Sequence, residues 1–239
     1  MNVRSIVFND HMVRAILQGR KTVARFAVEG ATAKWLIDQS PEWVADCAGE
    51  LCAYGQPGDQ LWVRENTEAE VSPCRAVILS RYVADKAPVI YSGCDDPAFD
   101  GTVAHWDYSK NVRPGARMHR WARRILLEIS AVRIERLQSI SEVQCIAEGI
   151  IPVPKINSEN QHERQFWRDY HLSGDGSFCV DTPRDSFETL WRHNSGWSYP
   201  NGAKLEAISP NRWDANPWVW VVEFRRVDSS LSATSRIAA

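Results

Sequence analysis

The sequence lacks any run of about 20 consecutive apolar residues, the length that a membrane-spanning helix requires. Its first ten residues, MNVRSIVFND, also lack the apolar core of a secretory signal peptide. The six cysteines show neither the spacing of a disulfide framework nor that of a four-ligand zinc site. These absences predict a cytoplasmic protein with reduced thiols, no bound metal, no cofactor and no membrane partner.

The sequence also lacks a large excess of charge of either sign, since its formal net charge is only -2. This balance argues against a protein that coats duplex nucleic acid, which is usually strongly basic. One segment departs from it: residues 108–127, YSKNVRPGARMHRWARRILL, contain His119 and no acid, and they hold six cations, namely Lys110, Arg113, Arg117, Arg120, Arg123 and Arg124.

Two interpretations of this basic segment stay open. Arginines that alternate with His119 and Trp121 can hold phosphates and stack on bases, so the segment is expected to contact RNA. Alternatively, Arg123 and Arg124 begin a strand, and alternation turns one of them toward solvent in any β protein.

Hydrophobic periodicity predicts short strands interleaved with short helices. The run 122–137 is expected to form two strands joined around Ser130, and the helix in 185–194 is expected to be capped by Asp185. Further strands are expected in 3–8, 21–26, 61–65, 77–83 and 213–227, and further helices in 11–19, 33–39 and 139–150, the last capped by Ser139 or Ser141 and ended by Gly149.

This order of elements predicts an α+β fold with one domain over residues 1–227. Regular alternation of strands and helices is missing, which excludes a doubly wound sheet and favours a small, partly open β-barrel decorated by short helices. Residues 84–118 and 151–184 are rich in polar residues and are expected to be irregular insertions. Residues 228–239 are small and polar, and a disordered tail is expected there.

Four segments form a recognisable combination: GRKTVAR (19–25), YGQPGDQLWVRE (54–65), RWARRILLEISAVRIERLQSISEVQCIAEGI (120–150) and WDANPWVWVVEFRRV (213–227). Together they resemble the ASCH-domain proteins of phages and prophages, and distantly the bacterial acetylcytidine amidohydrolase. The resemblance implies a PUA-like barrel, in a superfamily associated with RNA binding, and the host cytoplasm as location if a phage encodes the chain. Other ASCH members have been described as ribonucleases.

The resemblance also implies catalytic residues. The lysine and glutamate of the amidohydrolase fall on Lys21 and Glu148, but its threonine falls on Ala24. A methyl group cannot supply the nucleophile that a covalent acyl intermediate needs. Strand alternation would also place Lys21 and Ala24 on opposite faces, so a shared site requires Lys21 to lie before the strand begins. The alternative for Lys21 and Glu148 is a partly exposed structural ion pair.

A cationic cleft at the barrel mouth is therefore expected. Glu65 lies at this rim, where Arg25 would neutralise it. Trp213 and Asn216 can frame a base there, although an Asx-type turn explains them equally. The expected RNA contacts are Arg20, Arg25, Arg64, Arg117, His119, Arg120, Trp121, Arg124, Trp213 and Asn216.

Three functions follow from these observations. The main hypothesis is binding of single-stranded or structured RNA, or of a nucleoside, in the cationic cleft. The alternative is a hydrolase, either an amidohydrolase of acylated cytidine derivatives or a ribonuclease. A third interpretation is a phage adaptor whose two insertions bind a host protein.

Overall fold

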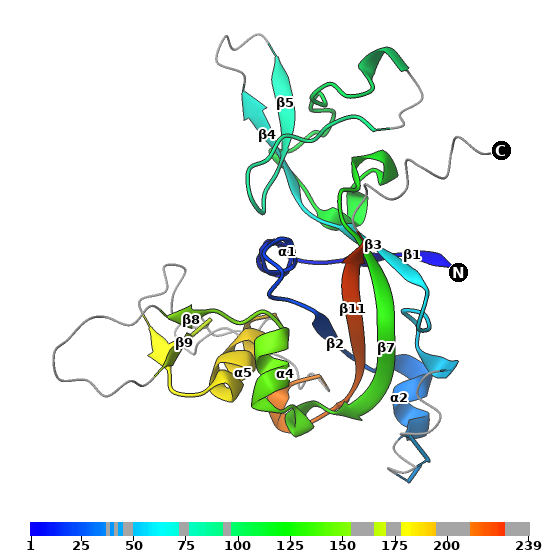
Figure 1. The fold of residues 1–239 in the computed structure, drawn as a ribbon, viewed down its shortest axis with the longest axis vertical. Coiled ribbons are helices and arrows are strands. Elements are labelled where there is room, and N and C mark those ends of the chain that lie inside the picture. Colours follow the sequence, from blue (N-terminus) through cyan, green and yellow to red (C-terminus); the bar gives the residue numbers. More distant parts are fainter. Residues whose placement is uncertain are drawn as a thin grey trace, which may run out of the picture. The chain divides into compact units, whose positions relative to one another are not determined.

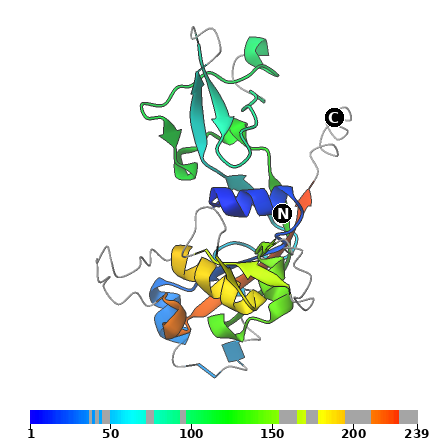
Figure 2. The same ribbon diagram turned by 90° about the vertical axis from the view of Figure 1, so that its left-hand side faces the viewer.

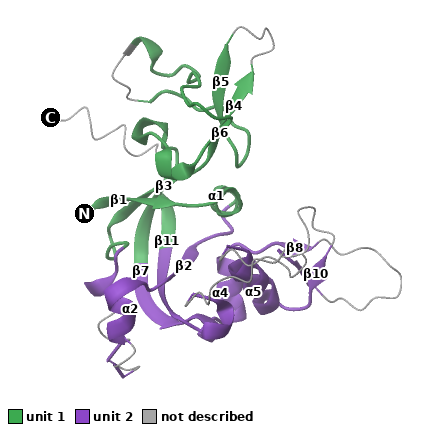
Figure 3. Cartoon of the chain, turned by 180° about the vertical axis from the view of Figure 1, so that it is seen from behind, with its two compact units in different colours: residues 1–18, 54–130, 224–239 green, residues 19–53, 131–223 purple. Residues whose placement is uncertain are grey.

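The computed structural model divides the chain into two compact units (Figure 3). Unit 1 comprises residues 1–18, 54–130 and 224–239, and unit 2 comprises residues 19–53 and 131–223. The predicted tail, 228–239, lies outside the described residues. Those residues are 1–36, 39–40, 43–44, 50–71, 77–92, 97–153, 165–170, 178–194 and 211–227.

The largest sheet has the strand order β1-β3-β7-β11-β2 (Figure 1). Its two long strands, β7 and β11, each belong partly to unit 1 and partly to unit 2 (Figure 3). β1 and β3 are parallel, whereas β3 and β7, and β11 and β2, are antiparallel. The five strands are β1 (Val3–Val7), β2 (Val23–Ala27), β3 (Gln60–Arg64), β7 (Leu126–Arg136) and β11 (Trp218–Val227).

Each unit adds a small sheet of three strands. Unit 1 holds the order β5-β4-β6, and unit 2 holds the order β10-β9-β8. Their bounds are β4 (Thr67–Val71), β5 (Ile78–Tyr82), β6 (Val112–Arg113), β8 (Pro152–Val153), β9 (Phe166–Arg168) and β10 (Cys179–Val180).

Four α-helices and several 3-10 turns complete the described structure. The helices are α1 (Asp10–Leu17), α2 (Gly30–Leu36), α4 (Glu142–Ala147) and α5 (Pro183–Asn194). The 3-10 turns are Pro97–Phe99, Gly115–Arg117, Arg120–Ala122, Leu137–Ser139 and Trp213–Ala215. The predicted α+β class is confirmed.

Among the described residues the largest sheet does not close on itself, so the small, partly open barrel expected from the sequence stays a prediction. β1 and β2 stand at the two ends of the sheet order, so no ladder joins them. The insertion 151–184 is also more regular than predicted, because it contains β8, β9 and β10. Strands of two or three residues are too short to show alternation, which explains why the sequence did not reveal them.

The prediction of two strands joined around Ser130 is wrong, because β7 is a single strand of 11 residues. Leu127 and Ile129 are buried, and the next buried residue of the strand is Ile134. It lies five positions after Ile129, whereas regular alternation would give an even number. The phase of the alternation therefore changes within the strand. Ser130 is the last residue of this segment that belongs to unit 1, so the break in the pattern marks the passage between units and not a turn.

The predicted ends of α4 are confirmed. The Ser141 hydroxyl accepts a hydrogen bond from the Gln144 amide, and the Gln144 side-chain oxygen accepts one from the Ser141 amide, which is a capping box. Gly149 follows the helix with a φ of +90°, a value that favours glycine.

The predicted start of α5 is wrong by two residues. This helix begins at Pro183, and the Thr182 hydroxyl accepts the Asp185 amide at 3.1 Å. Proline suits the first helical position because the amide that it lacks would have no helical partner there. Asp185 therefore lies in the first turn and is not the cap.

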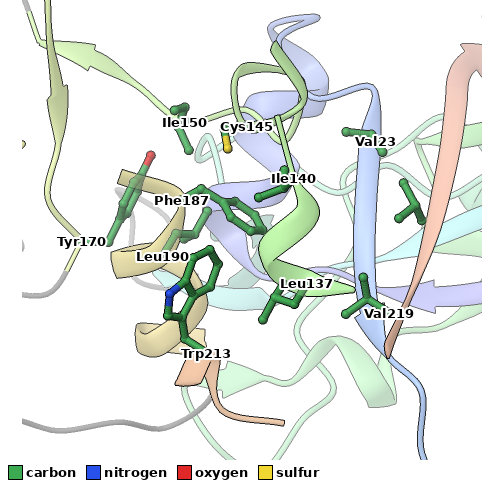
Figure 4. Packing of buried hydrophobic residues seen from close by; sticks show 11 residues of the cluster. Val23, Leu137, Ile140, Cys145, Ile150, Tyr170, Phe187, Leu190, Trp213 and Val219 are labelled. Atoms are coloured by element: carbon green, nitrogen blue, oxygen red, sulfur yellow. The ribbon is translucent and has the colours of Figure 1, made fainter. Parts of the chain in front are cut away.

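The core of unit 2 lies between α4, α5 and the strands β2 and β11 (Figure 4). α4 and α5 contact each other, as Figures 1 and 2 show. The buried cluster consists of Val23, Leu137, Ile140, Cys145, Ile150, Tyr170, Phe187, Leu190, Trp213, Val219 and Val221. A separate cluster in unit 1 consists of Tyr82, Val89, Ala104, Met118 and Ala122.

Candidate functional site

The glycine turn before β2 places Lys21 outside the regular strand. Gly19 has a φ of +70°, and β2 begins only at Val23. The Thr22 amide donates to the Ala147 carbonyl oxygen at 2.9 Å, which ties this turn to the end of α4. Strand alternation therefore does not set the direction of the Lys21 side chain, and the condition for a site shared with position 24, that Lys21 precede the strand, is met.

Lys21 and Glu148 form a buried pair. Lys21 Nζ lies 2.5 Å from Glu148 Oε2 and 3.1 Å from the Glu148 carbonyl oxygen. The two side chains are 0% and 4% exposed, so the prediction of a partly exposed pair is wrong. Arg20 donates to the Gly149 carbonyl oxygen next to this pair. Arg20 therefore helps to hold the end of α4.

Arg25 extends the pair into a network of alternating charges. Its guanidinium lies 3.1 Å from Glu148 Oε1 and 2.6 Å from Glu135 Oε1, and its side chain is fully buried. Arg133 contacts Glu135 at 3.5 Å and also pairs with Glu223, whose side chain is 43% exposed. Three cations thus meet three carboxylates from the interior to the surface of unit 2.

This balance corrects the prediction of a cationic cleft. Arg25 pairs with Glu148 and Glu135, whereas Glu65 pairs with Arg124. Buried charges persist in proteins when they are paired, so this network is in electrostatic balance without a ligand.

The chemistry available at this network is limited. Ala24 is buried opposite Val222 and has no hydroxyl. Burial raises the pKa of the nearby Cys145 thiol to about 12, so that thiol is protonated and a poor nucleophile at neutral pH. Among the described residues, the buried Nε–H of Arg25 has no acceptor, whereas its Nη1 and Nη2 groups donate to Glu148 and Glu135.

A second buried cluster, in unit 1, contains Glu65 and Arg124. Arg124 binds Glu65 with two hydrogen bonds of 2.9 and 2.7 Å and binds Asp85 at 2.7 Å. Its guanidinium lies 3.7 Å from the centre of the Tyr82 ring. Glu65 is fully buried, and this burial raises its pKa while Arg124 opposes the shift. Arg124, whose side chain is 19% exposed, therefore already has two carboxylate partners within unit 1.

Three other predicted contacts also have partners in the protein. Arg64 donates to the carbonyl oxygens of Gly115 and Ala116. Trp213 is only 6% exposed and belongs to the core of unit 2. Asn216 has a φ of +44°, and its side-chain oxygen accepts the Gln138 amide at 2.8 Å. Both residues thus have structural roles, but not those of the predicted Asx-type turn, because the amide that Asn216 accepts belongs to the distant Gln138.

The basic segment of unit 1 holds a group of four exposed cations. Lys110, Arg117, Arg120 and Arg123 are exposed. Within the part of the chain that the structure describes, none of these four has a carboxylate within ion-pair distance. Arg117 donates to the Tyr108 hydroxyl at 3.3 Å.

Asp107 holds Arg113 and His119 in place beside these cations. It accepts hydrogen bonds from the nearly buried Arg113 and from His119, whose Nε2 lies 3.1 Å away. Burial raises the pKa of Asp107, but these two partners outweigh it and hold that pKa below its usual range. The His119 ring stacks on Trp121 at 5.5 Å between centroids and 12° between planes.

Comparisons with protein-family models, with curated proteins and with solved structures found no match. The ASCH resemblance therefore stays a prediction from the sequence motifs. Among the described residues, no helix has the length and apolarity that crossing a membrane requires. Those residues also contain no group of three or more metal-ligating side chains close together.

The predicted residues thus fall into two groups. Unit 2 brings together Lys21, Arg20, Arg25 and Glu148, and unit 1 brings together Arg117, His119 and Trp121. Sequence reasoning missed Glu135, which looks like any polar residue of an alternating strand.

Proposed function

We propose that the protein binds single-stranded RNA, or a nucleoside within it, through the basic surface of unit 1. The supporting observation is the group of four exposed cations, Lys110, Arg117, Arg120 and Arg123, that lack carboxylate partners among the described residues. Cations left unneutralised attract phosphates, and association releases the counterions of the nucleic acid. The adjacent stacked pair of His119 and Trp121 adds ring faces that suit bases.

The salt dependence of binding tests this proposal. Filter binding of a single-stranded RNA at several salt concentrations is expected to give an affinity that falls as salt rises. Each phosphate contact contributes about 0.7 to the logarithmic slope for single strands, so Arg117→Gln, Arg120→Gln and Arg123→Gln together should reduce the slope by about 2.

Arg226→Gln is the matched control, because Arg226 is an exposed arginine of β11 outside this segment. It should leave the slope unchanged. Absence of binding at low salt, or an unchanged slope in the triple variant, would contradict the proposal.

A hydrolase is the second candidate, because the two side chains that the resemblance implies for catalysis meet at 2.5 Å. Without a hydroxyl at position 24, water has to attack the amide carbon, with Glu148 accepting the proton of water and the amine leaving with a proton. Burial opposes this candidate, since a substrate reaches Lys21 Nζ only if surrounding groups move.

Acetylated cytidine is the substrate that tests this second candidate. Deacetylation is followed by chromatography for the wild type, for Lys21→Met and for Ala24→Thr, with melting curves to show which variants are folded. The candidate predicts turnover by the wild type and loss of turnover in folded Lys21→Met. Turnover in Ala24→Thr alone indicates a scaffold that has lost its nucleophile, and no turnover in any form excludes the amidohydrolase.

A further inference from the structure

Five rings in unit 1 form a row in which each ring contacts the next. His119 stacks on Trp121, Trp121 lies 4.7 Å from Tyr91, Tyr91 lies 5.9 Å from Phe99, and Phe99 lies 6.1 Å from His105, between ring centroids. We call these five residues the ring row. Phe99 is 44% exposed, His105 is exposed, and the other three rings are half-buried.

The backbone beneath the ring row holds it in place. The Tyr91 amide donates to the Thr102 carbonyl oxygen at 3.0 Å, and the Gly101 amide donates to the Tyr91 carbonyl oxygen at 2.9 Å. Ile90 and Val103 pair as an antiparallel bridge. The Thr102 amide also donates to the Phe99 carbonyl oxygen at 3.0 Å. These bonds hold the backbone of Tyr91 and Phe99 and so reduce the entropy that ordering their rings would cost on binding.

The core of unit 1 also supports two of these rings. Tyr91 and Trp121 pack against the buried cluster of Tyr82, Val89, Ala104, Met118 and Ala122. Rings that are packed on a core and still half-exposed are rigid apolar surfaces. Exposed aromatic surface of this kind marks an interaction site more often than a random surface residue does.

The charged residues around the ring row indicate what kind of ligand it would bind. Residues 97–124 contain two acids and six cations, and of the acids Asp107 is already paired with Arg113 and His119. His119 and Trp121 of the ring row belong to the same segment as the exposed Arg117, Arg120 and Arg123. A ligand with flat apolar faces and regularly spaced negative charges matches both features.

We infer that the ring row is a stacking platform for consecutive unpaired bases, so that the ligand of this surface is a single strand and not a duplex. This inference rests on the proposed function and adds Tyr91, Phe99 and His105 to it. Stacking needs base faces, which a duplex hides within its own stack. Electrostatics alone would favour the duplex, whose charge density is higher.

The test compares the full-length protein and its variants on single-stranded RNA, single-stranded DNA and an RNA duplex of equal length. The wild type is expected to bind the single strands more tightly than the duplex. Phe99→Ala and Tyr91→Ala are each expected to weaken single-strand binding about 5- to 150-fold, the range for loss of one stacked base, with an unchanged salt slope.

Phe178→Ala is the matched control, because Phe178 lies in unit 2 and is 52% exposed, close to the exposure of Phe99. It should not change the affinity. Since Tyr91 is half-buried, Tyr91→Leu serves as a second variant, which keeps apolar bulk against the core and removes the ring.

The outcomes separate this inference from the proposed function. If no nucleic acid binds at low salt, the proposed function itself fails. If binding is salt-dependent but prefers the duplex, or if folded Phe99→Ala and Tyr91→Leu bind as the wild type does, the ring row is not a platform and the basic surface acts alone. Equal binding of RNA and DNA strands supports stacking without recognition of the 2′-hydroxyl.

Discussion

Replacing Glu148 by glutamine is expected to lower the free energy of unfolding by about 3–5 kcal/mol, the range for removing one partner of a buried ion pair. Glutamine keeps the size of the side chain, so the change isolates its charge. Lys21 and Arg25, whose side chains are fully buried, would both lose the carboxylate of Glu148, and Arg25 would keep that of Glu135. Chemical denaturation followed by circular dichroism measures the loss.

Glu223→Gln is the control at the other end of the same network. The Glu223 side chain is 43% exposed and pairs with Arg133, which is 32% exposed. Solvent screens such a pair, so the expected loss is about 1 kcal/mol or less. Equal losses in the two variants would show that burial does not set the strength of the network, and the assignment of Lys21, Arg25 and Glu148 as a buried structural network would then be wrong.

The sequence predicted individual elements better than their assembly. Capping residues and a terminal glycine define α4 locally, which is why its ends agree with the structure. Whether a sheet closes into a barrel depends on the pairing of strands far apart in the chain, and alternation within each strand does not contain that information. The break at Ser130 shows the same limit, since a local pattern could not distinguish a turn from a strand that passes between units.

The candidate site was predictable to the same degree. The family resemblance predicted that Lys21 and Glu148 share a site. The distribution of charged residues identified the basic segment. The roles of Arg25 and Arg124 were not predictable, because an arginine that pairs with a distant carboxylate looks the same in a sequence as one that meets a phosphate. Their partners, Glu135 and Glu65, lie 110 and 59 positions away.

Replacing Arg124 by methionine is expected to destabilise the protein by about 3–5 kcal/mol at neutral pH, because Glu65 would be left as an unpaired buried charge. Methionine retains apolar contact with the Tyr82 ring, so the loss reports mainly on charge. Arg81→Met is the control. Its partners Glu68 and Glu70 lie on partly exposed β4, and removal of such a pair should cost about 1 kcal/mol or less.

The pH dependence identifies Glu65 as the cause. Burial already raises the pKa of Glu65 and Arg124 opposes this, so losing Arg124 moves the folded-state pKa further up. An unfolded glutamate titrates near about 4.3, and below that pH the carboxyl is protonated in both states and needs no counter-charge. As pH rises toward the folded-state pKa, only the unfolded state gains by releasing the proton, so the free energy of unfolding falls.

The deficit of Arg124→Met relative to the wild type should therefore be largest at pH 7 and shrink toward pH 4.5. Adding Glu65→Leu to Arg124→Met should restore part of the stability at pH 7, because replacing both partners of a buried pair by apolar groups costs less than removing one. A deficit that is the same at both pH values, or a double variant less stable than Arg124→Met, would show that packing around Tyr82 and not the charge of Glu65 is what Arg124 supplies.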